Sequence, residues 1–221
     1  MTDKPEFEVK EVRTEITVPH QGKRITFVAP HFGPGTYTAV GKQIDEAGLL
    51  RPTLAETVSL VYSAIQNQDN KYAKYQVLGV LKDSWFWELF GSLRDRWFWG
   101  FNRIRFEPKE GAFISDRNRQ EINVPFGFET EDQSLEAFVK NPFILALAEG
   151  DEGVEKLIKI AESQKLTPSN IWGFKNVYGT EYALCALDPG GIVRLFFPDF
   201  SPYIHIFDCC AFGVLPEGEG K

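Results

Sequence analysis

The sequence contains few of the residues that build disulfide frameworks and metal sites. Its 221 residues include three histidines and three cysteines, Cys185, Cys209 and Cys210. No pair of cysteines has the CxxC spacing of a zinc ribbon, and a small, odd number does not suit a disulfide-bonded scaffold. These shortages exclude a disulfide-rich secreted domain. They favour a reducing, cytoplasmic setting and predict no metal site.

Long hydrophobic runs and positive net charge are also missing. The longest apolar stretches, such as FILALA at 143–148, are far shorter than the roughly 20 residues that span a membrane. The charged segment 1–15 has no apolar core of a secretory signal. The formal net charge of −7 argues against nucleic-acid binding over the whole surface, because phosphate contacts need clustered Lys and Arg. We expect a soluble protein without a membrane partner.

Aromatic residues are abundant, with 19 Phe, seven Tyr and five Trp against a single Met. Stiff rings bury large areas but need shaped neighbours, so this composition predicts an aromatic-rich core. The chain is long enough to bury a substantial core in one domain. We expect a single globular domain, 1–221, with a possible subdivision near 122–132, where Pro125, Gly127 and a run of acids interrupt the pattern.

Strands are predicted at both ends of the chain and near its middle. They fall where β-branched or alternating apolar residues are bounded by turn residues, at 7–18, 23–30, 97–108, 112–116, 181–187, 192–197 and 203–215. This irregular order, with helices between, does not suit regular βαβ units. It predicts an α+β fold with a mixed, mainly antiparallel sheet and hairpins packed against several amphipathic helices.

Amphipathic helices are predicted between these strands from apolar spacing and end signals, at 37–47, 52–67, 71–83, 84–91, 134–141, 152–164 and after Thr167. Thr53 and Glu56 have the spacing of a capping box. Asp132 or Ser134 is expected to open the helix at 134–141. Asp151 is expected to cap the helix at 152–164.

The segment HFGPGTYTAVGKQ, 31–43, comes closest to a catalytic motif. A phosphate-binding loop has the pattern GxxxxGK[ST] between a strand and a helix. Here five residues, not four, separate Gly35 from Gly41, and Gln43 stands where the magnesium-binding hydroxyl should be. The possible phosphate-binding residues are Gly33, Gly35, Gly41 and Lys42. The departures favour the alternative, a glycine turn followed by a helix that Thr36 caps.

The segment HIFDCC, 205–210, collects His, Asp and Cys side chains. In a strand His205 and Cys209 share a face but lie ~13 Å apart, too far for one metal with bonds of ~2.0–2.3 Å. A thiol hydrolase pairing Cys209 with His20 or His31 stays an alternative. A free cysteine in an aromatic strand is more often a small core residue.

A block of aromatic and arginine residues gives the most plausible functional surface. Read as a strand, one face presents Trp97, Trp99, Phe101, Arg103 and Arg105. Segment 94–121 holds six Arg and one Lys against five acids, a local positive excess in an acidic chain. Arginines beside aromatic planes suit stacking on planar ligands and protein hot spots. Alternatively, both tryptophans are core and the arginines pair with Glu107, Glu110 or Asp116.

These patterns favour a binding or interaction protein that uses the aromatic and arginine block. The expected partner is a protein, or a second copy through self-association, and a planar small ligand is a further option. One alternative is a small enzyme, either nucleotide-dependent or a hydrolase. Another is a structural component of a larger assembly. No HExxH, GxSxG, dinucleotide-binding or EF-hand motif occurs, so catalytic residues and cofactor stay unknown.

Overall fold

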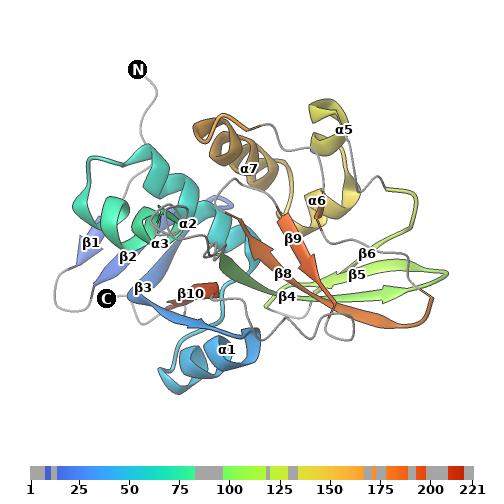
Figure 1. Cartoon of the computed structure of the whole chain (residues 1–221), viewed down its shortest axis with the longest axis horizontal. Coiled ribbons are helices and arrows are strands. Elements are labelled where there is room, and N and C mark those ends of the chain that lie inside the picture. Colours follow the sequence, from blue (N-terminus) through green and yellow to red (C-terminus); the bar gives the residue numbers. More distant parts are fainter. Residues whose placement is uncertain are drawn as a thin grey trace, which may run out of the picture.

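The structure is a computed structural model that describes residues 8–10, 14–82, 97–117, 120–128, 134–166, 171–172, 178–188, 193–197 and 209–216. Its strands form one sheet with helices on both sides (Figure 1). The strands are β1 Glu8–Lys10, β2 Glu15–His20, β3 Lys23–Gly35, β4 Phe98–Glu107, β5 Gly111–Ser115, β6 Glu121–Val124, β7 Ile171–Trp172, β8 Glu181–Leu187, β9 Val193–Phe196 and β10 Cys209–Val214.

The sheet runs in the order β1-β2-β3-β10-β4-β8-β9-β7, with β5 paired to β4 and β6 to β5. β10 and β5 share one edge of β4, since β8 pairs along the other edge. The β10–β4 and β7–β9 pairs are parallel, and the remaining pairs are antiparallel. The expected α+β fold with a mixed, mainly antiparallel sheet is therefore confirmed.

Helices cover both faces of the sheet. They are α1 Tyr37–Glu46, α2 Leu54–Gln66, the π-helical turn η1 Ala73–Val77, α3 Leu78–Lys82, α5 Leu135–Val139, α6 Pro142–Leu147 and α7 Asp151–Ser163. In Figure 1, α2 and α7 lie on one side of the sheet and α1 lies on the other. None of the helices in the described ranges is long and apolar enough to cross a membrane.

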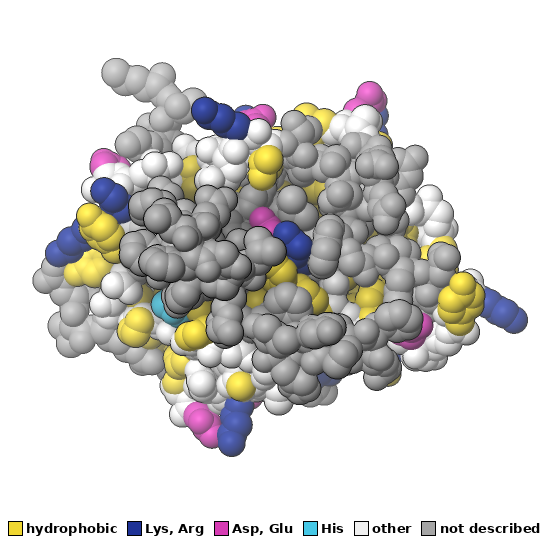
Figure 2. All heavy atoms as spheres, in the orientation of Figure 1, with side chains coloured by type: hydrophobic (Ala, Val, Ile, Leu, Met, Phe, Trp, Pro, Cys, Tyr) yellow, Lys and Arg dark blue, Asp and Glu magenta, His cyan; other side chains and the backbone are white. Residues whose placement is uncertain are grey.

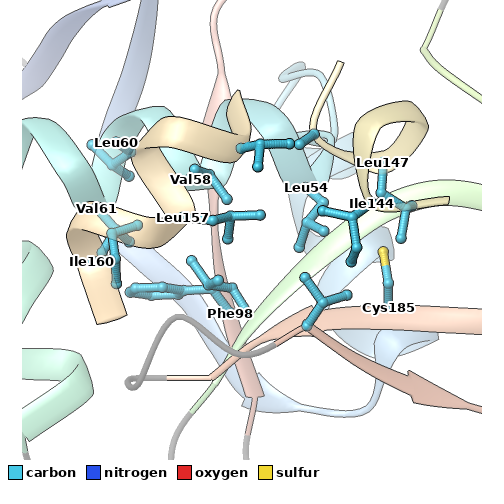
Figure 3. Close-up of a cluster of buried hydrophobic side chains, with 14 of the residues drawn as sticks. Leu54, Val58, Leu60, Val61, Phe98, Ile144, Leu147, Leu157, Ile160 and Cys185 are labelled. Carbon is cyan, nitrogen blue, oxygen red and sulfur yellow. The ribbon is translucent and has the colours of Figure 1, made fainter. Parts of the chain in front are cut away.

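The alternation of side chains along the strands creates two cores. The larger core lies between the sheet and helices α2, α6 and α7. Figure 3 shows Val58 and Leu157 meeting between α2 and α7, with Phe98 and Cys185 of the sheet below them. The smaller core lies under α1, whose Val40 and Ile44 are both fully buried.

Local end signals positioned most helices as expected. Thr53 and Glu56 form the complete capping box of α2, and the Ser134 side chain accepts from the backbone of α5. Asp151 was expected to cap α7, but this is wrong: Gly150, at a φ of 103°, is the N-cap and Asp151 is the first helical residue. A carboxylate there still favours the helix dipole.

Other parts of the expectation missed or fall elsewhere. α6 was not predicted, although Asn141 caps it and Pro142 opens it, because its apolar run is too short to show a helical period. The expected helix at 84–91 and the expected strand at 203–208 lie outside the described residues. Asp132 lies outside them as well. The helix expected after Thr167 is wrong where the segment is described, because Ile171–Trp172 form strand β7.

Candidate functional site

A bulge in β4 divides the aromatic and arginine block. Between Gly100 and Ile104 the register against β8 shifts, so that β4 advances four residues while β8 advances from Cys185 to Ala183. The extra residues of β4 in this bulge form hydrogen bonds with the start of α2. Phe101 N donates to Pro52 O at 2.8 Å, and Asn102 Oδ1 accepts from the backbone of the first helical residue at 2.7 Å. The two halves of the block therefore have different surroundings.

The aromatic half of the block is core. Trp97, Trp99 and Phe101 are 5%, 0% and 9% exposed. Trp99 Nε1 donates to Gly35 O at 3.1 Å, and the ring of Tyr37 in α1 contacts both Trp99 and Phe101. The expectation that these three aromatic residues lie exposed at a binding surface is therefore wrong, and both tryptophans are core, as the alternative interpretation had it. Helix α1 covers Trp99 and Phe101 through Tyr37.

The arginine half continues along the same face beyond α1. The Arg105 guanidinium lies over the Phe113 ring at 4.2 Å and pairs with Glu107 Oε1 at 2.5 Å and Glu121 Oε1 at 3.4 Å. A hydrogen bond from Thr180, followed by the one from Arg105, holds the pKa of Glu107 below its usual range. Arg105 is therefore fixed in orientation and electrically neutralised.

Arg103 and Tyr182 are the more accessible members of this face. Arg103 is exposed and forms no ion pair with any residue that the structure describes. Tyr182 lies opposite Arg105 in the β4–β8 register, and 61% of it is exposed. We call Arg103, Arg105, Phe113 and Tyr182 the arginine–aromatic face.

The arginine stacks on this side of the sheet share one design. Each guanidinium lies over an aromatic ring and is hydrogen-bonded to a carboxylate. The stacks are Arg51 over Phe101 at 5.6 Å, Arg105 over Phe113 at 4.2 Å and Arg194 over Trp97 at 4.4 Å, and the carboxylates are Asp45, Glu107 and Asp188. Within segment 94–121, the described residues Arg105 and Arg117 are paired with Glu107 and Glu56, whereas Arg103 forms no ion pair with a described residue. In Figure 2 the coloured Lys and Arg side chains lie scattered among acidic ones, without forming one basic stripe.

The glycine-rich segment does not form a loop around an anion site. Gly33 and Gly35 belong to β3, and the helix starts directly after Thr36, whose hydroxyl accepts from Ala39 N at 3.3 Å. Gly33 has a φ of 97°, and a Cβ there would lie 2.8 Å from Cys209 O. Its amide donates to Gln43 Oε1 at 3.2 Å. The backbone of this turn is thus already occupied by β10 and α1.

Gly41 and Lys42 lie inside α1. A Cβ on Gly41 would lie 2.8 Å from Arg51 Cζ, so this glycine makes room for the guanidinium that stacks on Phe101. Lys42 is exposed and pairs with Glu46 at 3.5 Å. A phosphate loop places its second glycine and lysine at the loop's junction with the helix. Gly33, Gly35, Gly41 and Lys42 therefore do not form a phosphate-binding loop, and the hypothesis of a nucleotide-dependent enzyme has no preformed loop to support it.

The thiols are poor candidates for nucleophiles. Cys185, Cys209 and Cys210 are buried and form no disulfide with one another. Burial raises the pKa of the Cys185 thiol to about 12, which leaves almost no thiolate at neutral pH. Within the described ranges, no group of three or more His, Cys, Asp or Glu side chains could hold a metal ion. His205 lies outside those ranges.

The structure brings together four polar side chains that no sequence pattern connects. We call this hydrogen-bonded group of His20, Ser59, Glu149 and Lys156 the polar chain. Ser59 Oγ lies 3.0 Å from His20 Nδ1 and 2.9 Å from Lys156 Nζ, and His20 Nε2 lies 3.2 Å from Glu149 Oε2. Because the Lys156 ammonium can only donate, the Ser59 hydroxyl accepts from it and can donate its own hydrogen bond to His20 Nδ1. In that tautomer the Nε2–H of His20 donates to Glu149 Oε2. This is the donor direction of a serine hydrolase triad.

The polar chain differs from an active site because a substrate cannot reach it. Ser59 is 1% exposed and lies within α2, away from the helix ends where free backbone amides could form an oxyanion hole. Burial raises the pKa of the Glu149 carboxyl, but hydrogen bonds from His20 and Thr53 outweigh it and the pKa is lowered. The polar chain joins β2, α2 and α7 and acts as a structural link. Its members are far apart in sequence and form no motif, so no local signal could have found them.

Comparisons with known proteins give no relative: no family model matches the chain, and neither a curated protein nor a solved structure matches it.

Proposed function

We propose that the protein is a binding protein that engages another protein through the arginine–aromatic face. The observation that carries the proposal is Tyr182, a large aromatic residue that is 61% exposed beside the Arg105–Phe113 stack. Tyrosine and arginine side chains supply much of the binding energy at protein interfaces. A guanidinium that is already stacked and paired loses little conformational freedom when a partner docks.

The face suggests what the partner presents. Arg103, exposed and without an ion pair among the described residues, suits a carboxylate, which an arginine can bind with two parallel hydrogen bonds. Tyr182 and the outer side of Arg105 suit a planar group, such as an aromatic or proline side chain. A second copy of this chain or a planar small ligand is a less favoured partner for this face. The net charge of −7 opposes self-association.

The test compares matched surface variants in a pull-down from extract. Arg103→Ala combined with Tyr182→Ala removes two side chains of the face without opening the core. Lys140→Ala combined with Tyr75→Ala is the control, because both side chains are exposed and lie outside the face. We expect the first pair to lose a specific partner by roughly tenfold or more, since hot-spot residues cost over 1 kcal/mol each. Equal recovery of that partner with both pairs would contradict the proposal.

Native mass spectrometry of the gently purified protein separates the alternatives. A mass increment for a nucleotide, with stabilisation by Mg²⁺–ATP or GTP that disappears in Lys42→Ala, favours the nucleotide-dependent enzyme. A bare oligomer favours a component of a larger assembly. A bare monomer favours the protein-binding function. The three buried thiols suit the reducing cytoplasm that we propose as its setting.

A further inference from the structure

A row of side chains crosses the arginine–aromatic face from strand to strand. Strand β4 lies between β5 and β8 here, with Phe113 of β5 opposite Arg105 and Tyr182 of β8 opposite Arg105 on the other side (Figure 1). Directly opposed residues share one side of the sheet, with Cβ atoms about 4.5–5.5 Å apart. The Arg105 guanidinium already lies over the Phe113 ring. The ring of Tyr182, which is 61% exposed, is therefore the member of this row that a partner can stack on.

Arg103 lies beside this row, two residues earlier on β4. The register between β4 and β5 is unbroken here, with Arg103 opposite Ser115 and Arg105 opposite Phe113. Alternate residues of an antiparallel strand point to the same side and lie ~6.8 Å apart along it. Because Tyr182 is level with Arg105, the face has a cationic position and an aromatic position at about this separation along the strand.

The charges of the face determine where an acidic group would bind. Arg105 is neutralised by Glu107 Oε1 at 2.5 Å and Glu121 Oε1 at 3.4 Å. Glu107 is the next residue on this side of β4 beyond Arg105, so a second carboxylate there would be repelled. Arg103 is exposed and forms no ion pair with a described residue. The acidic group therefore belongs over Arg103, and the planar group belongs over Tyr182.

We propose that the partner presents an extended segment in which one residue separates an acidic residue from an aromatic residue. This inference rests on the proposed function and specifies what binds at the same face. Alternate side chains of an extended segment project to one side ~6.6–6.8 Å apart, which matches the spacing along β4. The carboxylate then accepts two parallel hydrogen bonds from the Arg103 guanidinium, and the aromatic ring stacks on Tyr182. On a helix, side chains that share a face are three or four residues apart, so the sequence spacing distinguishes the two conformations.

The test is a titration of the full chain with synthetic peptides, followed by amide chemical shifts in NMR spectra. Each peptide has blocked ends and carries one Asp and one Phe in a host of Thr and Ser residues. Zero, one, two or three residues separate the Asp from the Phe, and both orders are made because the segment can run in either direction. We expect saturable shifts in β4 and β8. Binding should be roughly fivefold tighter for the single-residue separation than for the others, since only this spacing makes both contacts in an extended peptide.

Variants of the protein identify which contact each group of the peptide makes. Arg103→Ala should weaken binding of the peptide with the single-residue separation roughly tenfold, because a charge-assisted pair is lost. Replacing the Asp of that peptide by Asn should have the same effect on the unmodified protein and no further effect on Arg103→Ala. Tyr182→Ala should weaken binding several-fold. Lys140→Ala, which removes an exposed cation of α5, is the matched control and should bind as the unmodified protein does.

Equal binding at every separation would overturn the inference, and so would saturable shifts that are unchanged in Arg103→Ala or the absence of saturable shifts with every peptide. Tightest binding with two or three intervening residues would identify a helical segment and would overturn it as well. The pull-down separates this inference from the proposed function. If Arg103→Ala combined with Tyr182→Ala loses the protein partner but the peptides show no preference for spacing, the arginine–aromatic face stands as the binding surface and the extended segment is rejected.

Discussion

At the scale of single residues, Gly33 shows how a glycine that resembles part of a phosphate loop serves packing. Its φ of 97° lies in the region that disfavours side chains, and a Cβ would lie 2.8 Å from Cys209 O, a backbone atom that cannot rotate away. At Gly35, two residues later, a Cβ would make ordinary contacts of 3.4 and 3.7 Å. The two glycines thus have unequal structural roles.

Gly33→Ala is expected to destabilise the protein by about 2–4 kcal/mol, because backbone strain and a steric clash add. Gly35→Ala is expected to change the free energy of unfolding by less than about 1 kcal/mol. Urea denaturation of both variants measures the difference. Similar losses for both would mean that the close approach of β10 to Gly33 is not what that glycine provides.

Two buried serines of α2 allow the polar chain to be tested at the same scale. Ser59 connects Lys156 with His20, whereas Ser63 is 0% exposed and its hydroxyl has no hydrogen-bond partner within the described part of the chain. Ser59→Ala leaves two polar groups without their partner. Ser63→Ala removes a buried hydroxyl that satisfies nothing.

We expect Ser59→Ala to destabilise the protein by about 1–3 kcal/mol, the usual cost of leaving a buried polar group unsatisfied. Ser63→Ala should be neutral or stabilising by about 0.5 kcal/mol, because alanine is also the better helix former. The urea midpoints of the two variants, each compared with that of the unmodified protein, measure these changes. Equal changes in the free energy of unfolding would show that the hydrogen bonds of Ser59 add no stability beyond its packing.

At the scale of elements, Glu149 and Glu152 connect the β2–β3 turn to the start of α7. The Gln21 side chain donates to Glu149 O at 2.8 Å, and its backbone amide donates to Glu152 Oε1 at 3.4 Å. The pKa of the Glu152 carboxyl is lowered, chiefly by the hydrogen bond from Lys156, and that of Glu149 is lowered despite burial. Both carboxylates therefore bind protons more weakly in the folded chain than in the unfolded one.

The sign of the resulting pH dependence follows from linkage. The stability from these groups is fully present above the unfolded pKa of about 4.3 and is lost as pH falls through their lower, folded values. We expect Glu149→Gln to reduce the decline in stability between pH 5 and pH 3. Urea midpoints across this range measure it, and an unaltered slope in Glu149→Gln would refute the assignment.

Elements with strong local signals could be predicted from the sequence, and contacts between elements could not. The Thr53–Glu56 capping box and the turn after Gln21 are written in neighbouring residues, so α2 and the β2–β3 hairpin followed directly. The sequence pattern of β4 does not show that α1 covers Trp99 and leaves Arg103 exposed. That division depends on how α1 packs against the neighbouring strands β3 and β10, and no spacing in the sequence encodes this packing.

At the scale of the whole molecule, the larger core joins residues from both sides of the possible boundary near 122–132. Helix α7, after that segment, packs directly on α2, before it, and Phe143 of α6 stacks on Phe106 of β4. Strand β6, which begins at Glu121, pairs with β5 in the same sheet. Separating the chain near 122–132 would expose the apolar faces of α2 and α7 together.

We therefore expect one cooperative unfolding transition. Tryptophan fluorescence reports partly on Trp97 and Trp99 in the smaller core under α1, while far-ultraviolet circular dichroism follows the helices, most of which cover the larger core. Because both cores share the same strands, the two signals should have the same urea midpoint and the same dependence on denaturant. Two separated midpoints would show that the chain divides into units that unfold independently. Limited proteolysis between 122 and 132 would then release a folded fragment, which a single cooperative unit does not allow.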